Sequence, residues 1–313
     1  MMPQYSDTRT GRSAFTIGIC ASDRSENLPL LLELLESERF NKDLLRRIII
    51  VASGCSLETL ARLREVADRD RRFQIIEEST RLGKSEALNR IFENRIGDFL
   101  VLVNSDAIPE GDAINTLMEA IESNPRVGVV SASPFFQPSK GVVYRILELM
   151  WTLHNDWSLR LNHAGMNNHA SDELMVVSSR ALSKLPEGII NDGAYIAGTA
   201  FLKGFMIKFS EKARVQIDVP TRLTDLIQQR RRILFGHFQV WKWLGQSPRT
   251  AELMLLSAPT LTLGLLIRRI AQSPRLLQVL PIALISESAA LVLAAKDIIT
   301  STKQHRVWSR YKA

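Results

Sequence analysis

The stretch Asp98-Phe-Leu-Val-Leu-Val-Asn-Ser-Asp-Ala107 decides the fold. Its apolar run, 99–103, reads as a strand buried on both faces, and the polar residues that follow place the Asp106 carboxylate where that strand ends. A carboxylate there, with an open coordination position, could hold a divalent cation against a substrate phosphate. The same polar residues are what an ordinary strand-to-helix turn needs, so this run alone leaves both interpretations open.

The composition is that of a globular protein. With 313 residues, 45% of them hydrophobic and 23% charged, the chain can bury one large core or two smaller ones. Cys20 and Cys55 are too few for a disulfide framework and lack metal-ligand spacing, which fits a reducing compartment. Residues 1–13 are polar and contain no apolar signal segment. We therefore expect the catalytic part to remain in the cytoplasm.

Short β-branched runs alternate with helical patterns between residues 15 and 133. Strands are expected at 15–20, 47–52, 73–76, 99–103 and 127–130, and helices at 28–38, 56–69, 84–94 and 112–123. Apolar strands separated by helices predict an α/β fold with a mostly parallel sheet flanked by helices. Ligands of such sheets bind at the carboxyl ends of the strands. That rule puts the loops at 21–23, 53–54, 81–84 and 104–106 along one edge.

The loop Arg81-Leu-Gly-Lys84 is a second chemical signal. Gly83 permits close backbone approach, the following helix offers free N–H groups, and Arg81 and Lys84 bring positive charge, so a diphosphate could bind here. An ordinary helix start with solvated basic residues would look the same. The chain has no Gly-x-x-x-x-Gly-Lys-Ser/Thr loop and no Gly-x-Gly-x-x-Gly fingerprint, which argues against an ATPase and a dinucleotide-dependent oxidoreductase.

The formal net charge of +7 is concentrated toward the end of the chain. Such a field favours anionic partners, either phosphates or an anionic bilayer surface. The basic residues are not accompanied by a recognisable reading module or by base-stacking aromatic residues, so we expect no nucleic-acid partner.

Taken together, these motifs resemble the family 2 glycosyltransferases, enzymes with a GT-A fold that move a sugar from a nucleotide diphosphate to an acceptor. The likeness extends over about residues 15–237. The run 50–56 stands where the family has Val-Asp-Asp/Asn-Gly-Ser, and Arg81-Leu-Gly-Lys-Ser-Glu-Ala-Leu-Asn89 looks like its Arg-x-Gly-Lys-x-x-Ala-Leu-Asn segment. Asn104-Ser-Asp106 occupies the Asp-x-Asp position. Asn191-Asp192 is similar to the family's Glu-Asp pair, and Gln229-Arg-Arg-Arg-Ile233 to Gln-x-x-Arg-Trp.

The resemblance implies a role for each matched residue. Asp106 would bind Mg²⁺ or Mn²⁺ bridging the donor diphosphate. Asp192 would be the general base that deprotonates the acceptor hydroxyl in a single displacement, which inverts the anomeric configuration. The alternative is that Asp192 is only a first-turn carboxylate favoured by the helix dipole. The implied donor-binding set is Ser22, Ser53, Arg81, Gly83, Lys84, Asn104, Gln229 and Arg232.

Three departures from the family pattern limit what carries over. Ala52 and Ser53 replace carboxylates that often bind the nucleobase and ribose of the donor, so the sequence does not identify the nucleobase. Asn104 replaces the first Asp, and we expect the donor's own phosphates to complete the metal site. Ile233 replaces the tryptophan that processive polysaccharide synthases use beside the acceptor, which argues against cellulose-like or chitin-like synthesis.

The segment after Trp243 looks like a separate helical appendage. Residues 251–270 and 276–299 are apolar, but Pro259 and Pro281 interrupt them, and a spanning helix needs about 20 mostly apolar residues. We expect these helices to lie on a membrane surface with Arg268 and Arg269 toward anionic head groups. Packing as a soluble hairpin on the core or on a second subunit stays open, as does a homo-oligomer.

The predicted organisation is a tail at 1–14, a GT-A domain at 15–245 and a basic helical region at 246–313. Within the domain, 15–133 is the nucleotide-binding half and 134–245 the acceptor half. The expected activity is inverting, metal-dependent transfer from a nucleotide-diphosphate sugar to a glycan or lipid-linked acceptor, in cell-surface glycan synthesis at the cytoplasmic side of the cell membrane. One alternative is a sugar-nucleotide-binding protein without transferase activity. A sugar nucleotidyltransferase ranks last, because Cys20-Ala-Ser-Asp-Arg-Ser25 contains no glycine.

Overall fold

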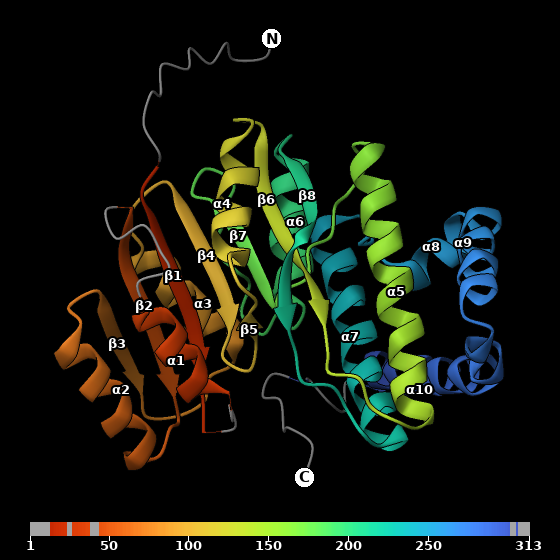
Figure 1. The fold of residues 1–313 in the computed structure, drawn as a ribbon, viewed down its shortest axis with the longest axis horizontal. Helices are drawn as coiled ribbons and strands as arrows, with labels where there is room; N and C mark the ends of the chain where they lie inside the picture. The colour runs from red at the N-terminus through yellow and green to blue at the C-terminus, as the bar shows by residue number, and fades with distance from the viewer. Residues whose placement is uncertain (1–12, 24–26, 38–43, 301–304, 306–313) are drawn as a thin grey trace.

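A single eight-stranded sheet forms the centre of the computed structural model, which describes residues 13–23, 27–37, 44–300 and 305 (Figure 1). The strand order is β3-β2-β1-β4-β7-β6-β8-β5. The strands are β1 (Phe15–Ala21), β2 (Leu45–Ser53), β3 (Phe73–Glu78), β4 (Phe99–Asn104), β5 (Ile108–Pro109), β6 (Val127–Phe135), β7 (Leu174–Ser178) and β8 (Met206–Gln216).

Strands β7 and β5 run against the direction of the others. Parallel pairing joins β1 to β2 and β4, β2 to β3, and β6 to β8, whereas β7 is antiparallel to both β4 and β6, and β5 to β8. The mostly parallel sheet predicted from the sequence is thus confirmed. Because β7 is reversed, its first residue lies at the edge where β1 to β4 end.

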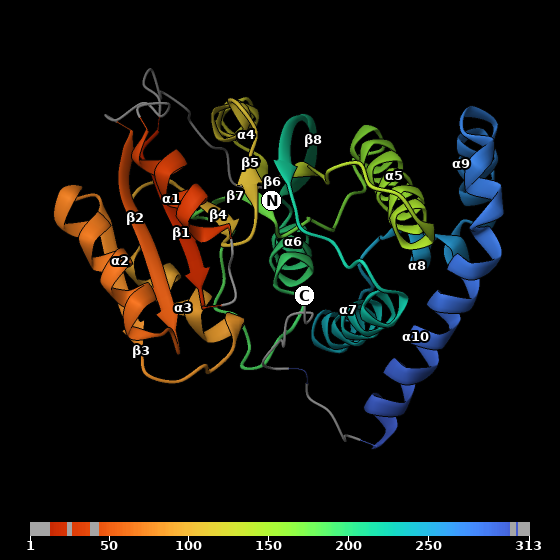
Figure 2. The ribbon, with the colours of Figure 1, turned by 60° about the horizontal axis from the view of Figure 1, so that its bottom comes forward.

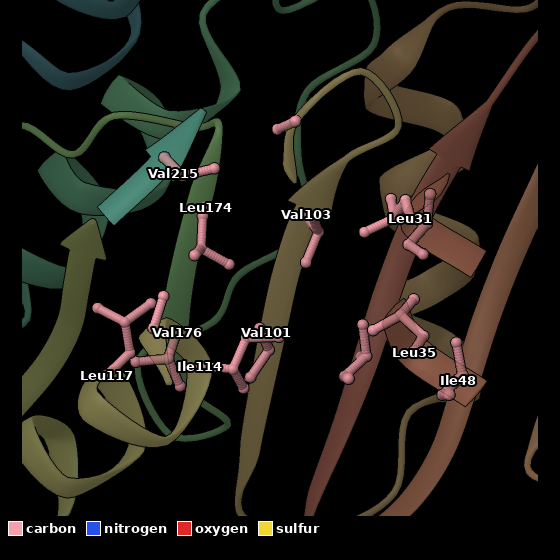
Figure 3. Close-up of a cluster of buried hydrophobic side chains, with 14 of the residues drawn as sticks. Leu31, Leu35, Ile48, Val101, Val103, Ile114, Leu117, Leu174, Val176 and Val215 are labelled. Atoms are coloured by element: carbon pink, nitrogen blue, oxygen red, sulfur yellow. The ribbon is translucent and has the colours of Figure 1, made fainter. Parts of the chain in front are cut away.

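Helices cover both faces of the sheet. They are α1 (Leu28–Glu36), α2 (Leu57–Arg69), α3 (Lys84–Asn94), α4 (Ala113–Glu122), α5 (Val142–His163), α6 (Asp192–Leu202) and α7 (Leu223–Leu244). Along β2, Ile48 and Ile50 pack in one core with α1, α2 and α4 (Figure 3), and Ile49 and Val51 pack in the other with α3 and α6. Burial on both faces explains why this strand is apolar throughout rather than alternating. Cys20 and Cys55 are free thiols.

The C-terminal segment consists of α8 (Ala251–Ser257), α9 (Pro259–Gln272), the 3₁₀ turn η1 (Pro274–Gln278) and α10 (Leu280–Thr300). Pro259 starts α9, because a proline cannot donate to the preceding turn, so the apolar stretch at 251–270 is two helices. Helix α10 packs against α7 (Figure 2). Within the described residues, no helix has the length and apolarity needed to cross a membrane. Most of the predicted tail, and the basic end of the chain after residue 305, lie outside the described residues.

Arg269 does not face outward as expected. Its guanidinium pairs with Asp156 on α5, with Nε 2.6 Å from Oδ2. The neighbouring Arg268 is exposed. This ion pair ties α9 to α5, so the segment is attached to the rest of the molecule at more than one helix.

Candidate active site

The ends of β1, β2, β3 and β4 bring the predicted loops to one edge of the sheet. Cys20 on β1 pairs with Asn104 on β4, and Ser53 on β2 pairs with Glu78 on β3. The reversed strand β7 adds residues that the sequence did not point to. The backbone N–H of Asn104 donates to the carbonyl of Glu173 at 3.0 Å, which places the start of β7 beside the end of β4.

Lys84 lies between two carboxylates at this edge. It is the first residue of α3 and follows Gly83, whose φ of 116° is open to glycine but strained for other residues. Its Nζ is 2.5 Å from Oδ2 of Asp172 and 3.0 Å from Oδ2 of Asp192. Burial alone would lower the pKa of Lys84, but the two carboxylates outweigh it and raise that pKa well above the usual range. Lys84 is therefore a permanent cation in the site.

Asp192 is buried at the first turn of α6. Asn191 caps the helix by accepting a hydrogen bond from the N–H of Ala194 at 3.3 Å. A Cβ on Gly193 would lie 2.7 Å from the carbonyl oxygen of Ala170, so only glycine lets this turn approach so closely. The Asp192 side chain is 3% exposed.

The two carboxylates differ in basicity. Burial raises the pKa of Asp192 to about 6, although Lys84 opposes the shift. For Asp172, burial acts in the same direction, but the closer contact with Lys84 and the charge of Arg232 prevail and lower the pKa to about 2. Both groups are ionised at neutral pH, and Asp192 is the stronger base. Glu173, whose side chain accepts from Ser171, has its pKa raised to about 7 by burial and by Asp172.

The three consecutive arginines of α7 point to different partners, because successive residues are turned by about 100° around a helix. Arg230 forms ion pairs with Glu252 and Glu287 at 2.9 and 2.8 Å. Arg231 pairs with Asp297 at 2.5 Å. Arg232 is the one whose charge acts on Asp172. Of these three arginines, only Arg232 acts on the site, and Arg232 is the one that matches the family motif.

The ends of β2 and β3 hold a buried carboxylate at an unpredicted position. The hydroxyl of Ser53 donates to Oε2 of Glu78 at 2.5 Å, and Arg90 pairs with Oε1 at 2.6 Å. Glu78 is 8% exposed. A Cβ on Gly54 would lie 2.8 Å from Cγ of Arg81, so Arg81 covers this turn. A carboxylate of the neighbouring strand therefore lies beside Ser53, one of the two positions where the family often has a carboxylate.

The family model described as Glycosyl transferase family 2 matches residues 16–183. The chain belongs to glycosyl transferase family 2. The poly-β-1,6-N-acetyl-D-glucosamine synthases of several Staphylococcus aureus strains are 22% identical over 199 residues, covering 62% of this chain and 48% of theirs. The chain therefore spans about half the length of these relatives.

Two solved structures share the fold. A mannosyltransferase from Pyrobaculum calidifontis, PcManGT, solved with GDP-Man and Mn²⁺, superposes with a TM-score of 0.64 at 18% identity, over 94% of this chain and 89% of that one. TarS of S. aureus superposes with a TM-score of 0.50 at 14% identity, over 71% and 39%. At these identities the likeness supports the GT-A-type fold of this family 2 member, and its function rests on the family and the site.

Asp106 lies in the turn just after β4, and its role as a metal ligand stays a prediction. The amide of Asn27 donates both to the carbonyl oxygen of Asp106 at 3.0 Å and to Oδ2 of Asp218 at 3.2 Å, so the turn is held against α1 and the end of β8. Among the residues that the structure describes, no three His, Cys, Asp or Glu side chains are arranged to hold a metal. An ion that takes one or two protein ligands and the rest from a diphosphate is compatible with this donor set.

A row of rings extends from the site toward the C-terminal helices. Trp151, His154, His169 and His237 make successive edge-to-face contacts with centroid distances of 5.3, 5.5 and 6.0 Å. Burial lowers the pKa of His154 to about 3 and those of His169 and His237 to about 4, so all three are neutral. This family 2 site therefore has an uncharged polar wall beside its carboxylates.

The remaining predicted residues are less closely joined to the Lys84 cluster. Ser22 lines a groove between α1 and α2 together with Asp23. Asp23 accepts the backbone N–H of Ser56 at 2.8 Å, which fixes the loop after β1 to the start of α2. Gln229 is half-buried one turn before Arg232 on α7. Their contacts with a donor stay predictions.

Proposed function

We propose that this glycosyltransferase inverts the configuration of the transferred sugar and that Asp192 is its general base. The observation that carries the proposal is the meeting of Lys84, Asp172 and Asp192 at the carboxyl edge of the sheet. A base works best when its pKa lies near the working pH, and burial brings the pKa of Asp192 to about 6. Asp172, with the lower pKa, stays paired with Lys84 and orients it.

Lys84 serves the base rather than replacing it. Its ammonium keeps both carboxylates ionised, so Asp192 is ready to accept the proton of an acceptor hydroxyl. Arg232 and Arg81 approach from α7 and from the loop after β3, where positive charge can stabilise a departing diphosphate. The donor diphosphate would lie between these cations, with the anomeric carbon toward Asp192.

Asp106, supported by Asn104, would hold Mg²⁺ or Mn²⁺, and the ion would neutralise charge on the diphosphate leaving group. The protein alone offers few anionic ligands there, so we expect the ion to bind weakly until the donor brings its phosphates. Mn²⁺ titration followed by electron paramagnetic resonance should detect tighter binding when a nucleoside diphosphate is present. An Asp106→Asn variant should lose that gain.

The donor is a nucleoside-diphosphate sugar and the acceptor a glycan or lipid-linked glycan. The family supports this substrate class, as does the similarity to a polysaccharide synthase and to a transferase solved with GDP-Man. The carboxylate of Glu78 could accept hydrogen bonds from N–H groups of the donor's nucleobase, but its presence does not identify that nucleobase.

A screen of nucleotide sugars with Mg²⁺ or Mn²⁺ tests the proposal. The release of nucleoside diphosphate identifies the donor, and proton NMR of the product gives the anomeric configuration. We expect hydrolysis or transfer with one donor class, with inversion. Binding of a donor without hydrolysis or transfer would favour the binding protein without activity, and failure of every donor to bind or react would count against the proposed function. Retention of configuration would remove Asp192 as the base of a single displacement.

A further inference from the structure

Strongly exposed apolar side chains occur on all three helices of the C-terminal segment. On α10, Ile285, Val292 and Ile299 are 68%, 68% and 82% exposed. They are seven residues apart, so they lie on one side of the helix. Leu256 on α8 and Ile267 on α9 are 81% and 65% exposed. We refer to these five residues as the C-terminal apolar face.

Acidic residues are absent from the outer side of this segment. The sequence between 251 and 300 has three acidic residues, Glu252, Glu287 and Asp297. All three form ion pairs with Arg230 or Arg231 of α7 and are thereby turned inward.

The basic residues divide differently. Arg269 is paired with Asp156, whereas Arg268, Arg275 and Lys296 are exposed, and none of these three forms an ion pair with a described residue. The outward charge of the described segment is therefore entirely positive. The folded structure separates the charges in a way that the sequence alone does not reveal.

We propose that the C-terminal apolar face docks on an anionic lipid bilayer, lying in its surface. Exposed apolar side chains bordered by lysine and arginine are typical of helices that bind at the membrane interface, where the basic residues contact lipid phosphates. A second copy of the chain fits less well, because a twofold interface on this face would bring the same positive residues together.

Helices α9 and α10 lie on the side of the molecule opposite β3 and α2, beyond α7 and α5 (Figure 2). Helix α10 is fixed to α7, which also carries Arg232. Docking would thus hold the site at a set distance from the bilayer, where a lipid-linked acceptor is anchored. This last link rests on the proposed function, but the docking itself does not.

Vesicle sedimentation with the full chain tests the docking. We expect binding to vesicles of phosphatidylcholine with phosphatidylglycerol, weaker binding at high salt, and little binding to phosphatidylcholine alone. The triple variant Arg268→Gln/Arg275→Gln/Lys296→Gln should bind about a hundredfold more weakly, since each basic residue near an anionic surface contributes roughly fivefold. Ile285→Asn/Val292→Asn should also lose binding. Leu57→Asn, at a position on α2 that is 82% exposed, is the matched control and should bind normally.

Three results would overturn the docking: no binding by the unaltered chain, equal binding by the charge variant, or an equal loss in the control. Light scattering tests the alternative of a second copy. If the unaltered chain is a dimer that does not bind vesicles, and Ile285→Asn/Val292→Asn is a monomer, the face is a contact between two copies of the chain. Circular dichroism checks that the variants fold. Donor hydrolysis in solution should be unchanged in all variants. If neither the unaltered chain nor any variant hydrolysed a donor, the proposed function would lose support. The vesicle result would not be affected.

Discussion

Lys84 lies closer to one of its two carboxylate partners than to the other, and this difference helps to give the two carboxylates different pKa values. Asp172 lies closer to Nζ than Asp192 does, 2.5 against 3.0 Å. Its pKa is lowered while that of the more deeply buried Asp192 is raised. When the environment moves two titratable groups apart in this way, the group with the higher pKa is the better proton acceptor.

An Asp172→Asn variant should move the acid limb of the pH profile of kcat/KM to lower pH. In the unaltered enzyme that limb should fall below about pH 6, because Asp192 must be deprotonated to act and its pKa is about 6. The substitution removes the negative charge of Asp172, which raises the pKa of Asp192. It also leaves Asp192 as the only carboxylate paired with Lys84. Both changes lower the pKa of Asp192. Activity at neutral pH should fall as the base weakens.

Glu77→Gln, in an exposed pair with Arg64, is the control and should leave the profile unchanged. An acid limb that stays near pH 6 in Asp172→Asn would mean that another group, such as Glu173, sets it.

The sequence pointed to Lys84 and Asp192 but not to Asp172 or Glu173. The first two lie in motifs of fixed spacing. The others precede β7, a strand that we did not predict, and their place at the active edge depends on that strand running backward. Only the three-dimensional pairing of β7 with β4 determines that direction. Glu78 was missed for a similar reason, since its place beside Ser53 depends on the pairing of β3 with β2.

At the scale of elements, the close approach of α6 to the chain at 170–172 depends on Gly193. A Gly193→Ala variant should lose most activity and about 1–3 kcal/mol of unfolding free energy, because the added Cβ would overlap backbone atoms that cannot move freely. Enzyme assays and urea unfolding measure the two effects. Gly264→Ala on α9 is the control, since nothing lies within 4 Å of its Cβ and alanine favours a helix. Equal behaviour of the two variants would contradict the proposed packing.

Elements with a strong periodic pattern were predicted well, and those shaped by tertiary contacts were not. The helix at 84–94 has the bounds expected from its pattern. Strand β6 continues past 130 to Phe135, because β8 pairs with the less apolar residues 131–135. The stretch at 251–270 divides at Pro259, where a proline signal was present in the sequence.

At the scale of the whole molecule, the net charge of +7 did not reveal which arginines are neutralised. Arg230 is 11% exposed and joins α7 to both α8 and α10 through Glu252 and Glu287. Arg230→Met should lower the unfolding free energy by about 3 kcal/mol, because two partly buried carboxylates lose their partner. Urea unfolding measures the loss.

If unpaired charge causes this loss, removing the two carboxylates should rescue Arg230→Met. Adding Glu252→Gln and Glu287→Gln should restore most of the stability, since the unpaired charges are then gone. Arg71→Met at an exposed site should change little. A triple variant as unstable as Arg230→Met alone would show that packing, and not charge, makes the arginine necessary.

The central claim is that Asp192 takes the acceptor proton, and turnover by Asp192→Asn tests it most directly. Nucleoside diphosphate release and donor affinity should be measured on the same preparation, with Asp225→Asn, another first-turn carboxylate, as the control. We predict that Asp192→Asn binds the donor with nearly unchanged affinity and loses transfer by at least about a hundredfold, while Asp225→Asn transfers normally. Normal transfer by Asp192→Asn would contradict the account.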